Sequence, residues 1–162
     1  MLRRVLLDGL KTGAALAATT TAALLYFSQR TRGSPWAGIN AVAHVVSGNG
    51  RTARGFSPRD TSVGLAVHAA SMLGWGLLYR AALSVAGVRG VVPAGIATLA
   101  IGFVDYELLP KRFSPGFERV LGPLGVGATF ATLGATLALS DVLTSPRALP
   151  AHAGDDPESW FV

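Results

Sequence analysis

The sequence contains no cysteine among its 162 residues. Disulfide bonds, thiolate metal ligands and cysteine nucleophiles are therefore excluded, and the redox compartment stays open. Charged residues are also scarce, at 14% of the chain, where soluble domains carry roughly 25%. This shortage of charge, beside a hydrophobic share of 50%, indicates a membrane protein.

The sequence signatures of common enzyme and nucleotide sites are missing as well. There is no His-Glu-x-x-His motif, no Walker loop and no Gly-x-Ser-x-Gly nucleophile motif. The glycine-containing run over 125–134 lacks the preceding strand that a dinucleotide-binding fingerprint needs. Ser71 lies near His68 in the sequence, yet no oxyanion-binding feature accompanies the pair. The sequence therefore favours a protein that is not an enzyme.

The balance of charge is basic, with a formal net charge of +5. In a membrane protein this excess most simply reflects loop arginines that lie near anionic lipid headgroups. We therefore expect the lipid bilayer and its anionic headgroups as partners, and no nucleic acid.

Four hydrophobic runs are each close to the length of a membrane-crossing helix. About 20 helical residues cross the hydrocarbon layer, which is roughly 30 Å thick. The third run reaches this length only if it carries Asp105 and Glu107 in its last turns, before Pro110 ends it. Asp60 or Thr61 is expected to cap the second helix. The expected helices cover about 5–28, 61–83, 90–109 and 119–141.

The first run could instead be a secretory signal peptide, because Arg3 and Arg4 precede it. The segment 19–30 offers no small-residue cleavage site, however, and three further runs follow. We therefore expect an all-α, multi-pass bundle over residues 1–142. Residues 143–162, rich in Pro, Asp and Ser, are expected to be a flexible tail.

Basic residues divide almost evenly between the two sides of a four-span bundle. One side has six, which are Arg3, Arg4, Lys11, Arg80, Arg89 and Arg147. The other side has eight, which are Arg30, Arg32, Arg51, Arg54, Arg59, Lys111, Arg112 and Arg119. By count alone the long first loop would be cytoplasmic, although the difference is too small to decide the orientation.

The fourth run carries a stripe of small residues, since Gly127, Ala131 and Ala135 recur at every fourth position. Small residues allow membrane helices to approach closely, so this stripe is expected to face another helix.

Residues 35–46 are expected to form a short helix at the membrane interface. Pro35 suits the first helical turn, and Ser34 would cap it. Asn40 and His44, four residues apart, would be neighbours on its surface. Its apolar face would comprise Trp36, Ile39, Ala43 and Val46.

Helix direction places several polar residues on the side of the long first loop. At 1.5 Å per residue, His68 lies about 10 Å along the second helix from Thr61, and Asp105 about 6 Å from the end of the third. The other members of this polar cluster are Asn40, His44, Glu107, Lys111, Arg112 and Glu118.

His44, His68 and Asp105 could together bind a divalent metal or carry protons. Each also has a structural interpretation. His44 would bond a carbonyl group, and His68 a serine or backbone oxygen between helices. Asp105 would pair with Lys111, Arg112 or a loop arginine. Apart from this divalent metal, the sequence predicts no cofactor.

Three segments resemble a group of small, uncharacterised four-helix bacterial inner-membrane proteins. They are Pro35-Trp36 with Asn40 and His44, His68-Ala69-Ala70-Ser71, and Asp105-Tyr106 followed by Pro110-Lys111-Arg112-Phe113-Ser114-Pro115-Gly116-Phe117-Glu118. The resemblance covers about residues 30–135, with Gly38 and Ala43 where that group more often has Pro and Ser. It implies a four-helix topology and a bacterial inner-membrane location, and it implies no activity.

Two hypotheses of different classes follow. In the first, the chain is a non-catalytic accessory subunit whose glycine and alanine faces pack on a partner or on copies of itself. In the second, His44, His68 and Asp105 bind a metal or carry a proton or a small polar solute. We favour the first, because a small bundle with such faces has little interior volume and no helix is visibly broken at the midplane.

Overall fold

A computed structural model describes residues 2–48 and 53–144, and within these ranges every regular element is helical. The elements are α1 (Leu2–Arg32), α2 (Trp36–Val42), α3 (His44–Ser47), α4 (Pro58–Ala86), α5 (Val91–Phe103), the π-helix η1 (Val104–Leu108) and α6 (Glu118–Thr144). The predicted all-α class is confirmed. The predicted tail lies outside the described residues from position 145 onward.

Three of the helices are long and apolar enough to cross a membrane. They are α4, the continuous α5–η1 segment and α6. Helix α1 is the longest element, but four threonines within residues 12–29 make its uncharged stretch less apolar. The boundaries of all four long helices lie within a few residues of those expected from the hydrophobic runs.

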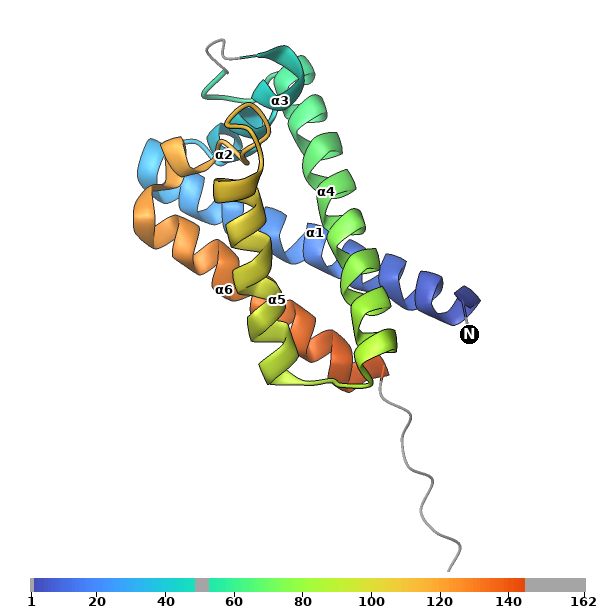
Figure 1. Ribbon diagram of the computed structural model, residues 1–162. Coiled ribbons are helices and arrows are strands. Elements are labelled where there is room, and N and C mark those ends of the chain that lie inside the picture. The colour runs from blue at the N-terminus through green and yellow to red at the C-terminus, as the bar shows by residue number, and fades with distance from the viewer. Residues whose placement is uncertain (1, 49–52, 145–162) are drawn as a thin grey trace, which may run out of the picture.

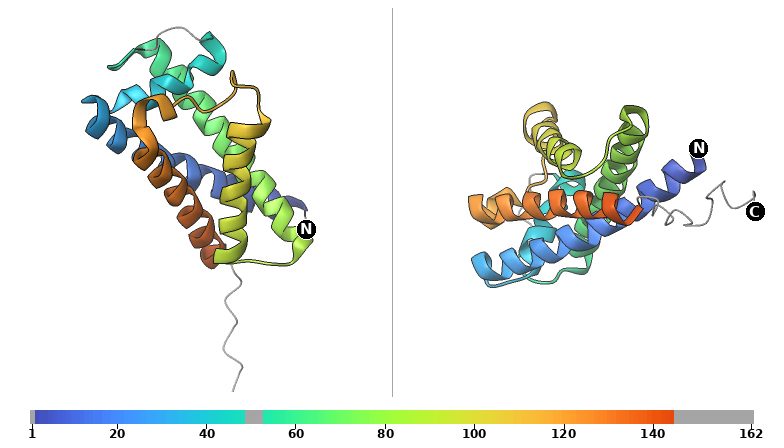
Figure 2. Two further views of the ribbon diagram at one scale, coloured as in Figure 1. Left: turned by 60° about the vertical axis from the view of Figure 1, so that its left-hand side comes forward. Right: turned by 90° about the horizontal axis from the view of Figure 1, so that it is seen from below.

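The four long helices pack unequally against one another. Helices α1 and α6 lie side by side, and α4 and α5 stand on the same side of that pair (Figure 2, right). Helix α4 packs mainly on α1, and α5 packs mainly on α6, whereas α4 and α5 contact each other little. The short helices α2 and α3 and the loop before α6 gather at the end of the bundle where α4 begins (Figure 1).

Helices α1 and α4 cross in backbone contact. A Cβ atom on Gly13 would lie 2.6 Å from the Cα atom of Leu73, and one on Gly76 would collide with the backbone of Gly13. Gly9 and Gly13 form a Gly-x-x-x-Gly pair, the spacing that allows helices to approach closely in lipid. The close approach of the α1 and α4 backbones thus depends on glycines at the crossing.

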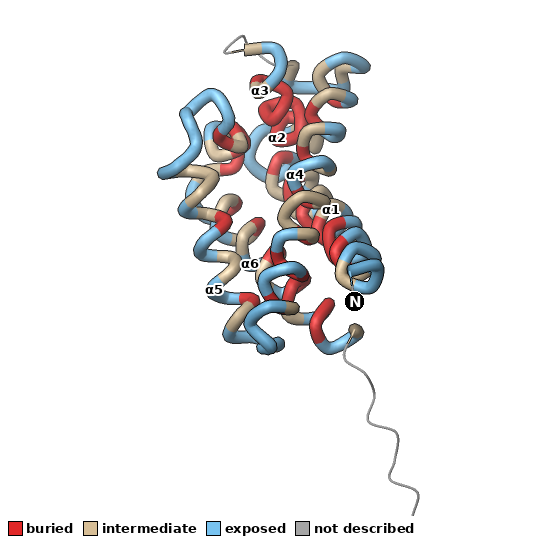
Figure 3. The backbone as a smooth tube through the Cα atoms, turned by 45° about the vertical axis from the view of Figure 1, so that its right-hand side comes forward, coloured by how far each residue is buried: buried red, intermediate tan, exposed pale blue. Residues whose placement is uncertain are grey.

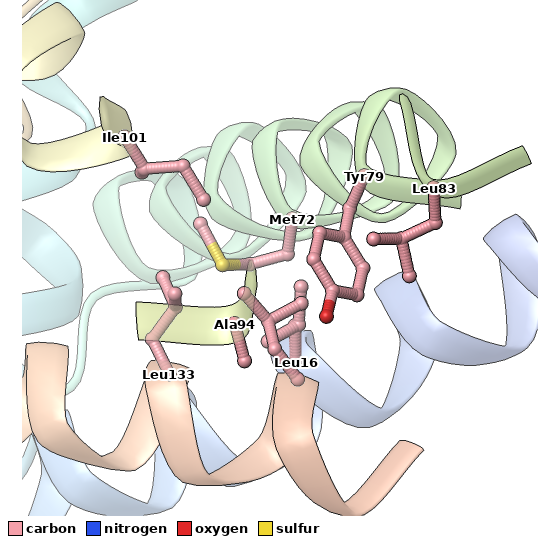
Figure 4. Close-up of a cluster of buried hydrophobic side chains, with 8 residues drawn as sticks. Leu16, Met72, Tyr79, Leu83, Ala94, Ile101 and Leu133 are labelled. Carbon is pink, nitrogen blue, oxygen red and sulfur yellow. The ribbon is translucent and has the colours of Figure 1, made fainter. Parts of the chain in front are cut away.

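Two clusters of buried apolar side chains hold the bundle. In the first, Met72 and Tyr79 of α4 lie against Leu16 of α1, with Ala94 and Leu133 from α5 and α6 (Figure 4). The second joins Leu24, Ile39, Val42, Phe117 and Leu121. Burial is concentrated along α1, α2 and the inner faces of α4 and α6, while α5 is largely exposed (Figure 3).

The ends of the helices differ in part from expectation. The cap of α4 is Ser57, whose Oγ accepts a hydrogen bond from the Asp60 N–H at 3.2 Å, so the predicted caps were wrong. Pro58 provides the fixed φ angle favoured in the first turn. After η1, Leu109 is extended, as expected of a residue that precedes a proline.

Helix α6 contains a kink that the hydrophobic run does not reveal. Gly122 has φ +68° and ψ 176°, and Pro123 follows it. A side chain at position 122 would be strained at this φ, and proline suits the start of the straight segment that follows. Residues 118–121 therefore form a separate turn ahead of the long part of α6.

Within the described residues, no other helix covers the small-residue stripe of α6. Gly127, Ala131 and Ala135 are all exposed, and a Cβ atom on Gly127 would meet nothing within 4 Å. The contact of α6 with α1 instead uses Leu133, which packs in one cluster with Leu16, and Thr136, which bonds Thr19. The helix that the stripe is expected to face is therefore not one of the described helices of this chain.

Candidate functional site

A cavity of about 380 Å³ lies between α4 and the segment that runs from η1 to the start of α6. Helices α1, α2, α3 and α6 contribute the rest of its wall. Apolar and aromatic side chains predominate, and the polar side chains are few. The lining residues are Thr20, Val42, Val45, Val67, His68, Ser71, Met72, Gly74, Trp75, Leu78, Asp105, Leu109, Phe113, Pro115, Phe117, Thr129, Phe130 and Leu133.

His68 reaches this cavity from the buried face of α4, where its residue is 5% exposed. Its Nε2 lies 2.9 Å from Thr20 Oγ1, and that hydroxyl donates to the Leu16 carbonyl at 2.6 Å. Because the hydroxyl has one proton, already given to Leu16, Nε2 of His68 must be the donor to Thr20. A neutral His68 then keeps Nδ1 as a hydrogen-bond acceptor.

Asp105 reaches the same cavity from the π-turn η1. A π-turn inserts one extra residue per turn and so changes which side chains face inward, and such turns are frequent at functional sites. Within the described residues Asp105 makes no ion pair or hydrogen bond, so the expected pairing with Lys111 or Arg112 is not formed. Lys111 and Arg112 are both exposed.

Asn40 ties α2 to the loop before α4 and to α4 itself. Its Nδ2 donates to the carbonyls of Ala53 and Gly55, each at 2.7 Å, and its Oδ1 accepts from Thr61 Oγ1 at 2.7 Å. The side chain is fully buried. These three bonds use both amide protons and the carbonyl oxygen, so Asn40 has a structural role.

His44 joins the short helices to the loop before α6. Its Nδ1 lies 2.8 Å from the carbonyl oxygen of Ala41, which can only accept, so Nδ1 is the donor. Gly116, at φ +81°, lies so close that a Cβ there would be 2.6 Å from His44 Nδ1. His44 Nε2 is buried without a hydrogen-bond partner among the described residues. The hydrogen bond to a carbonyl matches the structural interpretation of this histidine.

The short helices differ from the single amphipathic helix expected over 35–46. Helix α2 begins at Trp36, without a side-chain cap from Ser34, and a separate turn, α3, begins at His44. Six of the seven α2 residues are buried. The segment therefore packs between other helices and does not present one solvent-exposed face. Val46, expected on the apolar face, is 61% exposed.

The remaining residues of the predicted polar cluster do not converge on the cavity. Glu107, Lys111 and Arg112 are exposed, and Glu118 lies 3.9 Å from the exposed Arg119. His44 is not among the side chains that line the cavity. Among residues 2–48 and 53–144, no group of three or more potential ligand side chains is placed to hold a metal ion. The structure therefore brings together His68 and Asp105, without His44.

A buried ion pair that the sequence analysis missed links three helices at the opposite end of the bundle. Arg80 Nη1 donates to Asp141 Oδ1 at 2.9 Å, and Arg80 Nε donates to Thr12 Oγ1 at 2.8 Å. Tyr79 Oη and the Gly90 N–H donate to Asp141 Oδ2 at 2.7 and 2.9 Å. Arg80 was interpreted from the sequence as a loop charge, so its place in a buried ion pair was not predicted. The sequence did contain a signal for this pair. Arg80 and Asp141 have opposite charges and follow the second and fourth hydrophobic runs, whose ends lie on the same side of a four-span bundle.

Comparisons of the chain with family models, with curated proteins and with solved structures gave no significant match.

Proposed function

We propose that the chain is a non-catalytic, multi-pass protein of the bacterial inner membrane, with α1 as a fourth span. We propose further that it is an accessory subunit, which packs through the α5–α6 face on a helix of a partner or of another copy. The exposed small-residue stripe of α6 is the observation that carries the proposal.

The role of α1 as a span is supported by its length and its contacts. Its 31 residues correspond to about 46 Å of helix, which is enough to cross the hydrocarbon layer even when tilted. Its buried face is mainly small and hydroxylated, including Gly13, Thr12 and Thr20, and is covered by α4 and α6. The threonines that lower the hydropathy of α1 therefore face protein in part, where their hydroxyls bond carbonyls or other side chains.

The α5–α6 face has the features of a helix-docking surface. A shallow groove follows the line between the two helices, with Gly95 and Thr98 on one wall and Ala131 and Ala135 on the other. Leu99 beside it is 76% exposed. Small residues allow a further helix to approach its backbone closely, and lipid provides no hydrophobic drive that would make large side chains necessary.

The polar residues of the bundle give less support to catalysis. Asn40 bonds the loop before α4, His44 bonds the carbonyl of Ala41 in α2, and Arg80 and Asp141 bond each other. For the metal hypothesis, His44 would have to reach a cavity that it does not line. The geometry therefore favours the accessory function over a shared His44, His68 and Asp105 site.

Substitution on the stripe tests the proposal. We expect Ala131→Leu to abolish association of the purified protein in mild detergent, since the larger side chain fills the groove. Ala66→Leu is the control, because Ala66 is exposed on α4, away from the groove. Association is measured by light scattering for copies of the chain, and by co-purification from native membranes for a partner. A wild-type protein that is a lone monomer without a co-purifying partner would refute the proposal, as would equal effects of the two variants.

A further inference from the structure

The cavity beside α4 combines an apolar body with one acidic group. Four aromatic side chains line it, which are Trp75, Phe113, Phe117 and Phe130. Asp105 is the only acidic or basic side chain other than His68 among the described lining residues. The absence of Lys and Arg from this lining contrasts with a net charge of +5 for the chain. The sign of the local charge is thus opposite to that of the whole protein.

We infer that this cavity binds a lipophilic organic cation, that is, an ammonium or similar group attached to an apolar body. The inference goes beyond the accessory function and concerns a different surface. The cation would lie at the carboxylate of Asp105, and the apolar body would contact the aromatic and aliphatic wall. The volume of about 380 Å³ falls within the usual range for small-molecule sites.

The carboxylate supplies the first argument. An acidic group in a membrane-crossing segment is costly unless it has a partner, and Asp105 has no ion pair or hydrogen bond within residues 2–48 and 53–144. Arg80 and Asp141, by contrast, meet at 2.9 Å at the other end of the bundle. A bound cation would provide for Asp105 the partner that the fold provides for Asp141.

The aromatic wall supplies the second argument. Aromatic faces attract organic cations through their negative electrostatic potential, and the attraction increases where water is excluded. Phe117 is 5% exposed and fixed in the core, whereas Phe113 is half exposed on the loop before α6. The cavity wall therefore includes both a buried and a half-exposed aromatic side chain.

The position of the cavity suits a ligand that arrives from the bilayer. It lies between α4 and η1, and α4 and α5 stand apart on one side of the bundle (Figure 2, right). Both segments are long and apolar enough to cross a membrane. A lipophilic cation dissolved in the bilayer would thus encounter the site between two lipid-exposed helices. His68 would accept a hydrogen bond through Nδ1 from an ammonium N–H, if the cation has one.

Two ions of the same shape and opposite charge provide the test. We expect the intact protein in nonionic detergent to bind tetraphenylphosphonium saturably in equilibrium dialysis, and to bind tetraphenylborate much more weakly. Asp105→Asn should weaken phosphonium binding about tenfold or more, because the interaction between two close charges is lost. Glu107→Gln is the control, since this exposed carboxylate is two residues away and does not line the cavity.

Equal phosphonium affinity of the wild type and Asp105→Asn would overturn the inference, as would tetraphenylborate binding as tightly as the cation, or the absence of saturable binding. Circular dichroism checks that the variant is folded. If it is not folded, the comparison of the two ions on the wild type decides alone. Ala131→Leu should bind the cation normally, because Ala131 does not line this cavity. Failure of this inference and failure of the accessory function are therefore distinguishable.

Discussion

Removal of the Asp141 carboxylate should be among the most destabilising single changes in the bundle. Asp141 is 1% exposed and accepts hydrogen bonds from Arg80, Tyr79 and the Gly90 N–H. Asp141→Ala deletes three bonds and leaves the Arg80 guanidinium, whose residue is 6% exposed, without its counter-charge. Breaking one partner of a buried pair costs about 3–5 kcal/mol.

A surface pair on α1 provides the internal control. Arg4 and Asp8 approach only to 3.8 Å, with side chains 66% and 23% exposed. Asp8→Ala should therefore change the free energy of unfolding by about 0.5 kcal/mol or less. Both variants are measured by loss of helical circular dichroism during titration of detergent-solubilised protein with a denaturing detergent.

A double-mutant cycle separates the ion pair from simple loss of packing. Arg80→Met in the Asp141→Ala background removes the unpaired charge, so the double variant should be more stable than Asp141→Ala alone, by about 2 kcal/mol. The reasoning fails if Asp141→Ala costs no more than Asp8→Ala. It fails equally if the effects of Asp141→Ala and Arg80→Met simply add.

Three further predictions concern the joints of the fold. Asn40→Ala should lower the free energy of unfolding by about 2 kcal/mol or more, and hydrogen exchange should show faster opening of the loop before α4. Gly116→Ala should destabilise the protein, because φ is +81° at this position and a Cβ atom there would meet His44. Adding His44→Ala should recover only the part of the lost stability that is due to this contact, and thermal unfolding measures both effects. Gly76→Ala should lower the melting temperature, whereas Gly74→Ala should not, because only Gly76 meets α1; equal effects would contradict the proposed crossing.

The hydrophobic runs were sufficient to predict the long helices, because length and apolarity are local properties of the chain. Pro110 and the residue before it ended the third segment as expected. The cap of α4 was predicted less well. Thr61 is a competent cap by residue type, but its hydroxyl donates to Asn40, from a segment 21 residues earlier. Several residues near the start of α4 have side chains that can cap a helix. The choice among them thus depended on a contact between segments.

The candidate site could be predicted only in part for the same reason. Helix direction placed Asp105 near the end of its helix, but not on a π-turn, and a one-residue change in winding decides which side chains face inward. His44 and Asn40 were recognised as unusual, yet His44 lies against Gly116 of the loop before α6, and Asn40 bonds the loop before α4. Such contacts between distant segments leave no periodic pattern in the sequence.

The sequence by itself predicted the all-α class and the positions of the four long helices, and it predicted four membrane spans. Within the described residues, three helices are long and apolar enough to cross a membrane. Only the tertiary structure decided which polar groups meet. Arg80 pairs with Asp141, whereas Asp105 does not pair with Lys111 or Arg112. It also decided that the small residues of α6 face outward while Gly13 and Gly76 form the inner crossing. Composition shows that helices can approach, but the rotation of each helix about its axis selects the face that does so.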